Sequence, residues 1–253
     1  MGNFRIERVH TLQEMEVVSE FFRQVWKGGP DVVPFDLGVA MLHVGAYCSA
    51  AYEGTEIVGA SFGLVGRYRD EAILHSHVTG SFRPGAGYEL KRDQFSWAQE
   101  NQIAAITWSF DPLVRRNCVF NFDKLGATAI EYLPNFYGTM TDDINAGDDS
   151  DRLFAWWPIN PNTAQPKPVE EISCAVFNHN GRPVINDIDI NSPFTVYLPE
   201  DIETMRRTDL GLAQEWRVAV RTALEPAFAG GATISHTLNR EALIVHPSTK
   251  QES

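Results

Sequence analysis

Apolar and polar residues alternate from Phe4 to His10, which is typical of a half-buried strand. A helix is predicted from Leu12 to about Trp26, because Thr11 can cap its first turn and Glu14 completes a capping box. The run Lys27-Gly28-Gly29-Pro30 ends this helix. The chain is therefore expected to open with a strand followed by a helix.

The same patterns predict the elements that follow. A short helix is expected over 37–44, then strands over 46–52 and 56–66 with a hairpin signal at Glu53-Gly54, and a strand over 72–79. Next come a helix over 88–101, a strand over 103–108, a helix over 116–125, and strands over 128–133 and 153–157. This order favours an α/β fold, a mixed twisted sheet flanked by helices.

A stretch rich in proline and asparagine separates this part from the remainder of the chain. We therefore predict a domain over 1–158, a linker over 159–170, and a small α+β lobe over 171–253. Strands are expected in the lobe over 171–177, 194–198, 232–236 and 242–246, and helices over 200–206 and 212–224. The lobe is expected to pack on the main sheet. A lid or dimer surface that shapes an acceptor pocket is the alternative.

The net charge limits which classes of partner this protein can bind, and the cysteine content indicates its cellular compartment. The net charge of −12 over 253 residues argues against nucleic acid, whose phosphates attract basic surfaces. No apolar run reaches the roughly 18 residues of a membrane helix, and no signal-peptide pattern is present. Three widely spaced cysteines without a CxxC pattern suit a reducing cytoplasm. We expect a cytoplasmic protein that binds no nucleic acid or membrane, and the oligomeric state is left open between a monomer and a homodimer.

One stretch, residues 71–97, has the pattern of an anion site. It runs from a strand through a turn with Pro84, Gly85 and Gly87 into a helix that begins at about Tyr88. The free N–H groups of a first helical turn and the helix dipole both favour negative charge at such a turn. Glycine also allows a ligand to approach the backbone closely.

Several short motifs resemble the GNAT acyltransferase superfamily. In chain order they are LHSH at 74–77, WSFDPL at 108–113, RN at 116–117, KLGA at 124–127, YG at 137–138, NAG at 145–147 and SDR at 150–152. The resemblance covers about residues 4–158, and 190–245 more loosely. It implies a GNAT-like fold, with acetyl-CoA or another acyl-CoA as co-substrate. The implied reaction transfers the acyl group to the amine of a small molecule, such as an amino acid or a biosynthetic intermediate.

The resemblance also implies a set of cofactor-binding residues. They are Thr79, Gly80, Ser81, Arg83, Gly85, Ala86, Gly87 and Tyr88 around the turn, and Asn117 at the start of a later helix beside Arg115 and Arg116. Two features depart from the family pattern. Phe82 stands where glutamine or arginine is usual, with Arg83 one place late, and the turn over 81–86 is about four residues short.

These departures leave a second function open. The turn could be an ordinary strand–helix connection, and the chain a degenerate GNAT-fold protein that binds another ligand or catalyses a different reaction. A purely structural or interaction protein is a third class. The many polar residues at strand ends argue against it.

His75 and His77 are the first catalytic candidates, because residues two apart on a strand point to one face. Either histidine could take the proton from an acceptor amine, and Glu71 is a further possible base. The two histidines could instead ligate a metal together with Asp111, or serve a structural role. We expect no metal site.

The general acid that protonates the departing thiolate is less clear. The resemblance implies a tyrosine in the helix before KLGA, but Phe122 occupies that position. Tyr137 is the best substitute and Tyr132 the next, unless either is a core tyrosine with a bonded hydroxyl. Asp111 could orient a histidine or the acceptor amine, or simply cap the turn at Pro112.

Overall fold

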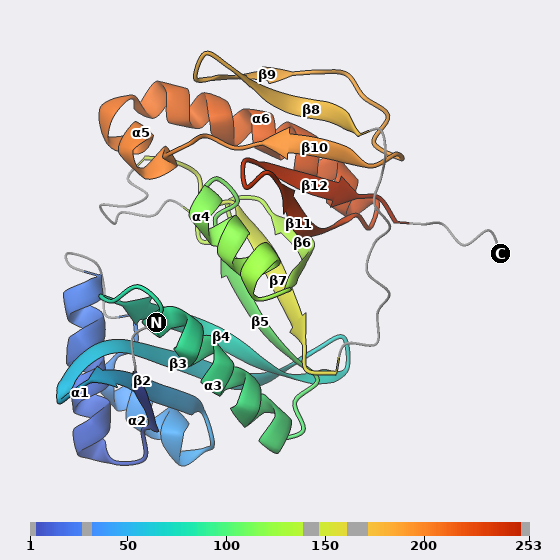
Figure 1. Cartoon of the computed structure of the whole chain (residues 1–253). Helices are drawn as coiled ribbons and strands as arrows, with labels where there is room; N and C mark the ends of the chain where they lie inside the picture. Colours follow the sequence, from blue (N-terminus) through green and yellow to red (C-terminus); the bar gives the residue numbers. More distant parts are fainter. Residues whose placement is uncertain (1–3, 27–31, 139–146, 161–171, 249–253) are drawn as a thin grey trace. The chain divides into compact units, whose positions relative to one another are not determined.

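The computed structural model describes residues 4–26, 32–138, 147–160 and 172–248 (Figure 1). The chain forms two compact units, one of residues 1–108 and 158–161 and the other of residues 109–157 and 162–253. The boundaries of these compact units differ from the domain boundaries predicted at residues 158 and 171. The predicted domain boundaries remain a prediction. Residues 145 and 146 of the NAG motif and most of the predicted linker lie outside the described ranges.

The first unit is a mixed sheet with helices on both faces. Its strands run in the order β1 (Arg5–Arg8), β2 (Tyr47–Glu53), β3 (Glu56–Tyr68), β4 (Glu71–Ser81) and β5 (Ala105–Phe110, of which residues up to 108 belong here). The helices are α1 (Leu12–Val25), α2 (Phe35–His43) and α3 (Ala86–Glu100). Neighbouring strands are antiparallel except for β4 and β5, which are parallel. The predicted fold class is confirmed.

Strand alternation explains the two layers of helices. Ala50 of β2 belongs to the core beneath α1 and α2, with Phe21 and Phe62. Its neighbour Ala51 faces the other side and packs with Leu90 of α3. Helix α1 begins where the sequence predicts, and its capping box is present. Burial of both sheet faces therefore follows from the small and apolar residues of β2 and β3.

The adjacency of β4 and β5 is the fold prediction on which the GNAT resemblance depends, and it is confirmed. The parallel ladder joins Ile73 to Ala105 and ends with the pair His75 and Thr107. Two residues later, in its pairing with β3, β4 contains a bulge, because Val78 pairs with Phe62 and Ser76 with Gly63, which leaves His77 as the extra residue. Pairing between β4 and β5 stops at His75, the second residue of the LHSH motif.

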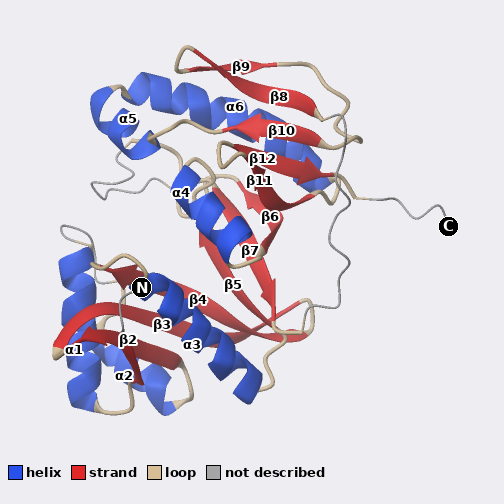
Figure 2. Ribbon diagram, in the orientation of Figure 1, coloured by secondary structure: helices blue, strands red, loops and turns tan. Residues whose placement is uncertain are grey.

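The second unit contains a longer strand series. In order of neighbours it runs β7 (Arg152–Pro158, of which residues up to 157 belong here), β6 (Thr128–Leu133), β11 (Thr233–Leu238), β12 (Ala242–His246), β10 (Phe194–Tyr197), β8 (Ser173–His179) and β9 (Arg182–Ile185), drawn red in Figure 2. The predicted C-terminal lobe is joined by strand pairing to β6, through Ile234 and Ala129, rather than only by packing of side chains. Helices α5 (Ile202–Thr208) and α6 (Leu210–Ala229) belong to the same unit.

Two local structures differ from the sequence prediction. The helix expected over 116–125 is a short α-helix, α4 (Arg115–Cys118), that continues as a π-helix, η1 (Val119–Lys124). Strand β9 was not predicted, although Asn180-Gly181 is a strong hairpin signal and both residues have positive φ. Pro183 inside β9 masks the strand pattern, but β9 is the edge strand, where a missing N–H is tolerated. In the described ranges, no helix combines the length and apolarity needed to span a membrane.

Candidate functional site

The glycine turn after β4 has the backbone expected of an anion site. Gly85 is the N-cap of α3 with φ of 95°, a conformation that disfavours every residue with a Cβ. The N–H groups of Tyr88 and Glu89 both donate to the Gly85 carbonyl oxygen, at 3.1 and 3.2 Å. In the described part of the chain, the N–H of Gly87 makes no backbone hydrogen bond outside the helix. This N–H is therefore the natural donor to an anion in the turn.

The side chains around the turn are less suited to phosphate. Arg83 is paired with Glu53, with Nε 3.0 Å from a carboxylate oxygen, and a second carboxylate, Glu56, lies 3.9 Å away. Phe82, which replaces the usual polar residue, stacks edge-on against Phe21 of α1 with ring centroids 5.1 Å apart. A phosphate would have to compete with Glu53 for the guanidinium of Arg83.

Internal contacts involve three of the predicted cofactor-binding residues, Gly80 through packing and Thr79 and Ser81 through hydrogen bonds. A Cβ on Gly80 would lie 2.7 Å from the ring of Trp26, so this glycine makes room for α1. The hydroxyl of Thr79 shares a hydrogen bond with Ser61, at 2.6 Å. Ser81 donates to the carbonyl oxygen of Arg83, at 3.4 Å. The cofactor-binding role predicted for these three residues remains a prediction.

The two histidines of LHSH have different environments. His75 is half-buried, and its Nδ1 lies 3.1 Å from the hydroxyl of Thr107. Burial, together with the charges of His77 and Lys91, lowers the pKa of His75 to about 4, so it is neutral at pH 7 and a weak base. His77 is exposed, and its Nε2 lies 2.9 Å from the carbonyl oxygen of Val32. Since a carbonyl only accepts, Nε2 of His77 carries a proton, which leaves Nδ1 of the neutral ring to accept one.

Lys91 is a titratable residue of this region that the sequence analysis did not select. It lies on the buried face of α3, with only 5% of its surface exposed. Its Nζ is 2.8 Å from the hydroxyl oxygen of Ser76 and 4.0 Å from the centre of the Trp108 ring. Burial lowers the pKa of Lys91 to about 7. The available signal was its spacing, since Leu90, Lys91, Gln94 and Ala98 share one helix face.

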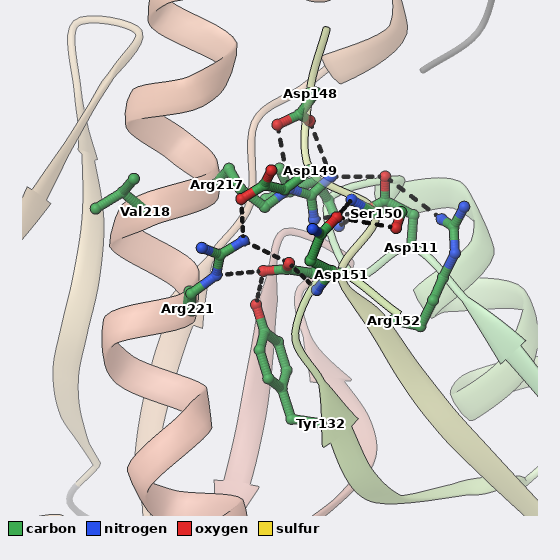
Figure 3. A network of polar contacts seen from close by, with 12 residues as sticks. Asp111, Tyr132, Asp148, Asp149, Ser150, Asp151, Arg152, Arg217, Val218 and Arg221 are labelled. Carbon is green, nitrogen blue, oxygen red and sulfur yellow. Dashed lines mark hydrogen bonds and ion pairs between the residues drawn. The ribbon is translucent and has the colours of Figure 1, made fainter. Parts of the chain in front are cut away.

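In the second unit, Asp111 of the WSFDPL motif belongs to a buried ion-pair network (Figure 3). Its carboxylate accepts from Arg206 of α5 and Arg217 of α6, and Asp148 accepts from the same two arginines at 2.9 Å. Burial alone would raise the pKa of Asp111, but the charges and hydrogen bonds of Arg217 and Arg206 outweigh it and lower the pKa to about 2. Asp111 also accepts from the Leu113 N–H at 2.9 Å, so the predicted turn cap is present.

The SDR motif holds the turn that carries Tyr137. The Tyr137 N–H donates to the hydroxyl oxygen of Ser150 at 2.9 Å, and this hydroxyl donates to the Gly138 carbonyl oxygen at 2.8 Å. Asp151 accepts from the Asn135 N–H at 2.9 Å and from Arg221 of α6 (Figure 3). The C-terminal helix α6 thus orders a motif turn far from it in sequence.

The two tyrosine candidates are distinguished by exposure. Tyr132 is buried, and its hydroxyl donates to Asp151. Burial raises the pKa of Tyr132, and the negative charge of Asp151 raises it further. Tyr132 therefore matches the structural alternative, a core tyrosine whose hydroxyl is hydrogen-bonded. Tyr137 is 51% exposed, and its hydroxyl lies 2.8 Å from that of Ser109. Phe122 is buried against Phe110, in agreement with its lack of a proton to donate.

Asn117 and its arginine neighbours begin α4. Asn117 is half-buried, and Arg116 forms a two-bond ion pair with Glu203. A cavity of about 580 Å³ adjoins this helix start in the second unit. Its charged lining residues are Arg115, Arg116, Arg240, Glu200, Asp201 and Glu241. Equal numbers of acidic and basic groups do not by themselves select an anion.

Neither a protein-family model nor a curated protein sequence matches this chain. Solved structures with similar folds are, however, GNAT proteins. The acetyltransferase of the GNAT family from Streptococcus pneumoniae is 11% identical, with a TM-score of 0.50 over 62% of this chain and 100% of its own. An N-acetyltransferase from Staphylococcus aureus Mu50 has the same identity and TM-score, over 62% and 99%. The yncA protein of Salmonella typhimurium, solved with its cofactor acetyl-CoA, is 14% identical with a TM-score of 0.50, over 65% and 98%. These similarities establish a GNAT-like fold.

Proposed function

We propose that this protein is an acyl-CoA-dependent acyltransferase that acylates the amine of a small molecule. The observation that carries the proposal is the turn at Gly85. This turn has a left-handed backbone at Gly85 and opens the 15-residue helix α3. It follows strand β4, whose pairing with the parallel strand β5 ends at His75. The likeness of the fold to structures of N-acetyltransferases, one of them with acetyl-CoA, supports it.

In this proposal the turn binds the pyrophosphate of acyl-CoA through its backbone N–H groups. The unpaired edge of β4 beyond His75 supplies further N–H and C=O groups for the rest of the cofactor, including a donor to the thioester carbonyl. His77 accepts the proton of the acceptor amine at Nδ1. Most of the rate arises from orienting the two substrates. The roles predicted for Tyr137 and Asn117 remain predictions from the resemblance.

Replacing Gly87 by valine should abolish CoA binding. Gly87 has ordinary helical backbone angles, and a Cβ there would meet only the Ser81 hydroxyl at 3.6 Å, so α3 should form normally. The added methyl groups would instead occupy the space in front of the first-turn N–H groups. Calorimetry with CoA on the wild type and the variant measures the effect. We expect binding by the former and no detectable heat from the latter.

Gly66→Val is the matched control, since Gly66 lies in β3 with open space around a Cβ. It should bind CoA like the wild type. Equal CoA affinity of Gly87→Val and Gly66→Val would contradict the assignment of the turn.

Replacing His77 by asparagine should lower kcat about 10²-fold or more and leave the affinity for acyl-CoA nearly unchanged, because a general base acts in the chemical step. The acid limb of the pH–rate profile should flatten at the same time. The assay is release of the CoA thiol in a panel of amine acceptors. His75→Asn serves as the comparison, because His75 is already a weak base at pH 7. Full activity of His77→Asn would assign His77 a structural role.

A second function is favoured by one observation. The ion pairs of Arg83 with Glu53 and Glu56 place two carboxylates beside the turn, which opposes the binding of a pyrophosphate. The alternative is a GNAT-fold protein that takes a ligand without a pyrophosphate. Absence of heat and of thermal shift with every acyl-CoA tested, for the wild-type protein, would select this alternative.

A further inference from the structure

Lys91 is a buried amine without an acidic partner. In the part of the chain that the structure describes, no carboxylate interacts with it, and burial is the only cause that shifts its ionisation. Lys91 interacts electrostatically with His75 of β4, and a positive charge on Lys91 contributes to the lowered pKa of that histidine. An ammonium buried without a counter-ion is costly, so such a lysine has a strong tendency to be uncharged.

The hydrogen bonds around Lys91 also suit an uncharged amine. Two nitrogens lie within hydrogen-bonding distance of the Ser76 hydroxyl oxygen: Nζ of Lys91 at 2.8 Å and Nε2 of Gln94 at 3.0 Å. If both donate, the hydroxyl proton of Ser76 needs a further acceptor. If Lys91 is uncharged, Ser76 can accept from Gln94 and donate to the Nζ lone pair. Gln94 also has a buried carbonyl oxygen without a hydrogen-bond partner among the described residues.

The position of the amine relates it to the proposed reaction. The ladder between β4 and β5 ends at His75 and Thr107, and the next residues of the two strands are Ser76 and Trp108. Nζ contacts both of them. The amine therefore lies at the point where the two parallel strands stop pairing. In our proposed function this is where the unpaired edge of β4 begins to hold the acyl-CoA.

We propose that Lys91 is a nucleophilic amine that becomes acylated by an acyl thioester bound between β4 and β5. This inference rests on the proposed function for the identity of the donor. The class of substrate is an activated acyl group, an acyl thioester with a short chain, because the amine is buried among Ser76, Gln94 and Trp108.

The chemical step balances without any further reactant. The Nζ lone pair attacks the thioester carbonyl carbon, so that an N–C bond forms and the C–S bond breaks. The amine loses one proton, and the departing thiolate gains one. The product is an amide on Lys91 and a free thiol. A neutral amide is cheaper to bury than an ammonium, and its new carbonyl and N–H can enter the polar cluster of Ser76 and Gln94. Each chain would accept one acyl group and keep it.

The experiment measures acylation of two lysines by mass spectrometry at pH 7.5. The wild-type protein is incubated with acetyl-CoA and, in parallel, with S-acetyl-N-acetylcysteamine, a short thioester that has no pyrophosphate. Lys124 is the reference, because it is exposed. An ordinary exposed lysine is more than about 99% protonated at this pH. We therefore expect Lys91 to gain an acetyl group at least about ten-fold faster than Lys124, with a rate that rises up to about pH 7 and then levels off.

Two variants and one binding measurement complete the test. Lys91→Arg should lose the adduct while Lys124→Arg keeps it. Labelling of Lys124 before Lys91 with both donors, or no label on Lys91 with either donor, would overturn the inference. Labelling of Lys91 by the short thioester, combined with no binding of CoA in calorimetry, would retain the inference and reject the proposed function. Binding of CoA with no label on Lys91 from either donor would do the reverse.

Discussion

Replacing Lys91 by methionine should raise the free energy of unfolding at pH 7 by about 3–4 kcal/mol. Burial lowers the pKa of Lys91 from an ordinary value near 10.5 to about 7, and each unit of pKa corresponds to about 1.4 kcal/mol. Methionine fills a similar volume without a charge, and loss of the hydrogen bond to Ser76 subtracts about 1 kcal/mol. Ser76 keeps its bond to Gln94. Urea denaturation of the two proteins measures the difference.

The pH dependence separates this effect from a general improvement in packing. The folded state of the wild type binds fewer protons than the unfolded state between about pH 7 and pH 10.5, so its stability rises with pH across that window. Below pH 7 both states are protonated and the full destabilisation applies. Lys91→Met should remove this rise, and the two proteins should converge toward pH 10.5. A constant difference from pH 6 to pH 10 would contradict the assignment. A residue kept at such a cost fits a functional role.

Replacing Asp111 by alanine should lower the free energy of unfolding of the second unit by about 3–5 kcal/mol. Asp111 is buried and accepts hydrogen bonds from Arg206 and Arg217, whose side chains are only 3% and 2% exposed. Removal of the carboxylate leaves two buried guanidiniums to share Asp148. Breaking a buried pair costs this much because the remaining charge is uncompensated. Urea denaturation of the wild type and the variant, followed by far-UV circular dichroism, measures the difference.

An exposed ion pair of the same unit provides the control. Arg182 and Glu215 are 2.7 Å apart, but their side chains are 62% and 49% exposed, so Arg182→Ala should cost at most about 1 kcal/mol. The wild type should also lose stability as the pH falls from about 4 to 2, because the folded pKa of Asp111 is about 2 against an unfolded value near 3.9. This acid transition should be weaker in Asp111→Ala. Similar costs for the two variants would show that burial of the network contributes little.

Elements with a strong local signal could be predicted from the sequence. Helix α1 has its capping box, β6 and β12 have the predicted bounds, and β4 and β5 are parallel neighbours as the order of elements required. The capping box and the bounds of β6 and β12 depend on residues close together in the chain. The pairing of β4 with β5 joins residues 32 apart, such as Ile73 and Ala105, and was predicted from the order of motifs and elements. Strand β9 and the π-helix η1 were missed, since a proline on an edge strand and a wider helical turn become acceptable only in a tertiary setting.

The environments of individual side chains could be predicted from the sequence less well than the helices and strands. The two histidines of the LHSH motif differ in burial, and burial of His75 lowers its pKa to about 4. Asp111 was selected as a group that could face substrate, and its contacts instead place it among the arginines of α5 and α6. These arginines lie about 100 residues away in sequence, at separations of 95 and 106. No local pattern encodes such a pairing.

The sequence by itself determined the class of this protein: alternating and helical periods, a glycine turn at a helix start and an ordered set of motifs together predict a GNAT-like sheet with helices on both faces. The tertiary structure alone decided which polar groups are charged, paired or left without a partner. Lys91 is a buried amine because α3 places the helix face that carries it against Ser76. Asp151 holds the turn before Tyr137 through the Asn135 N–H, and α6 supplies Arg221 to pair with Asp151. Periodicity is local and survives in the sequence, whereas desolvation and ion pairing depend on distances that only the folded chain defines.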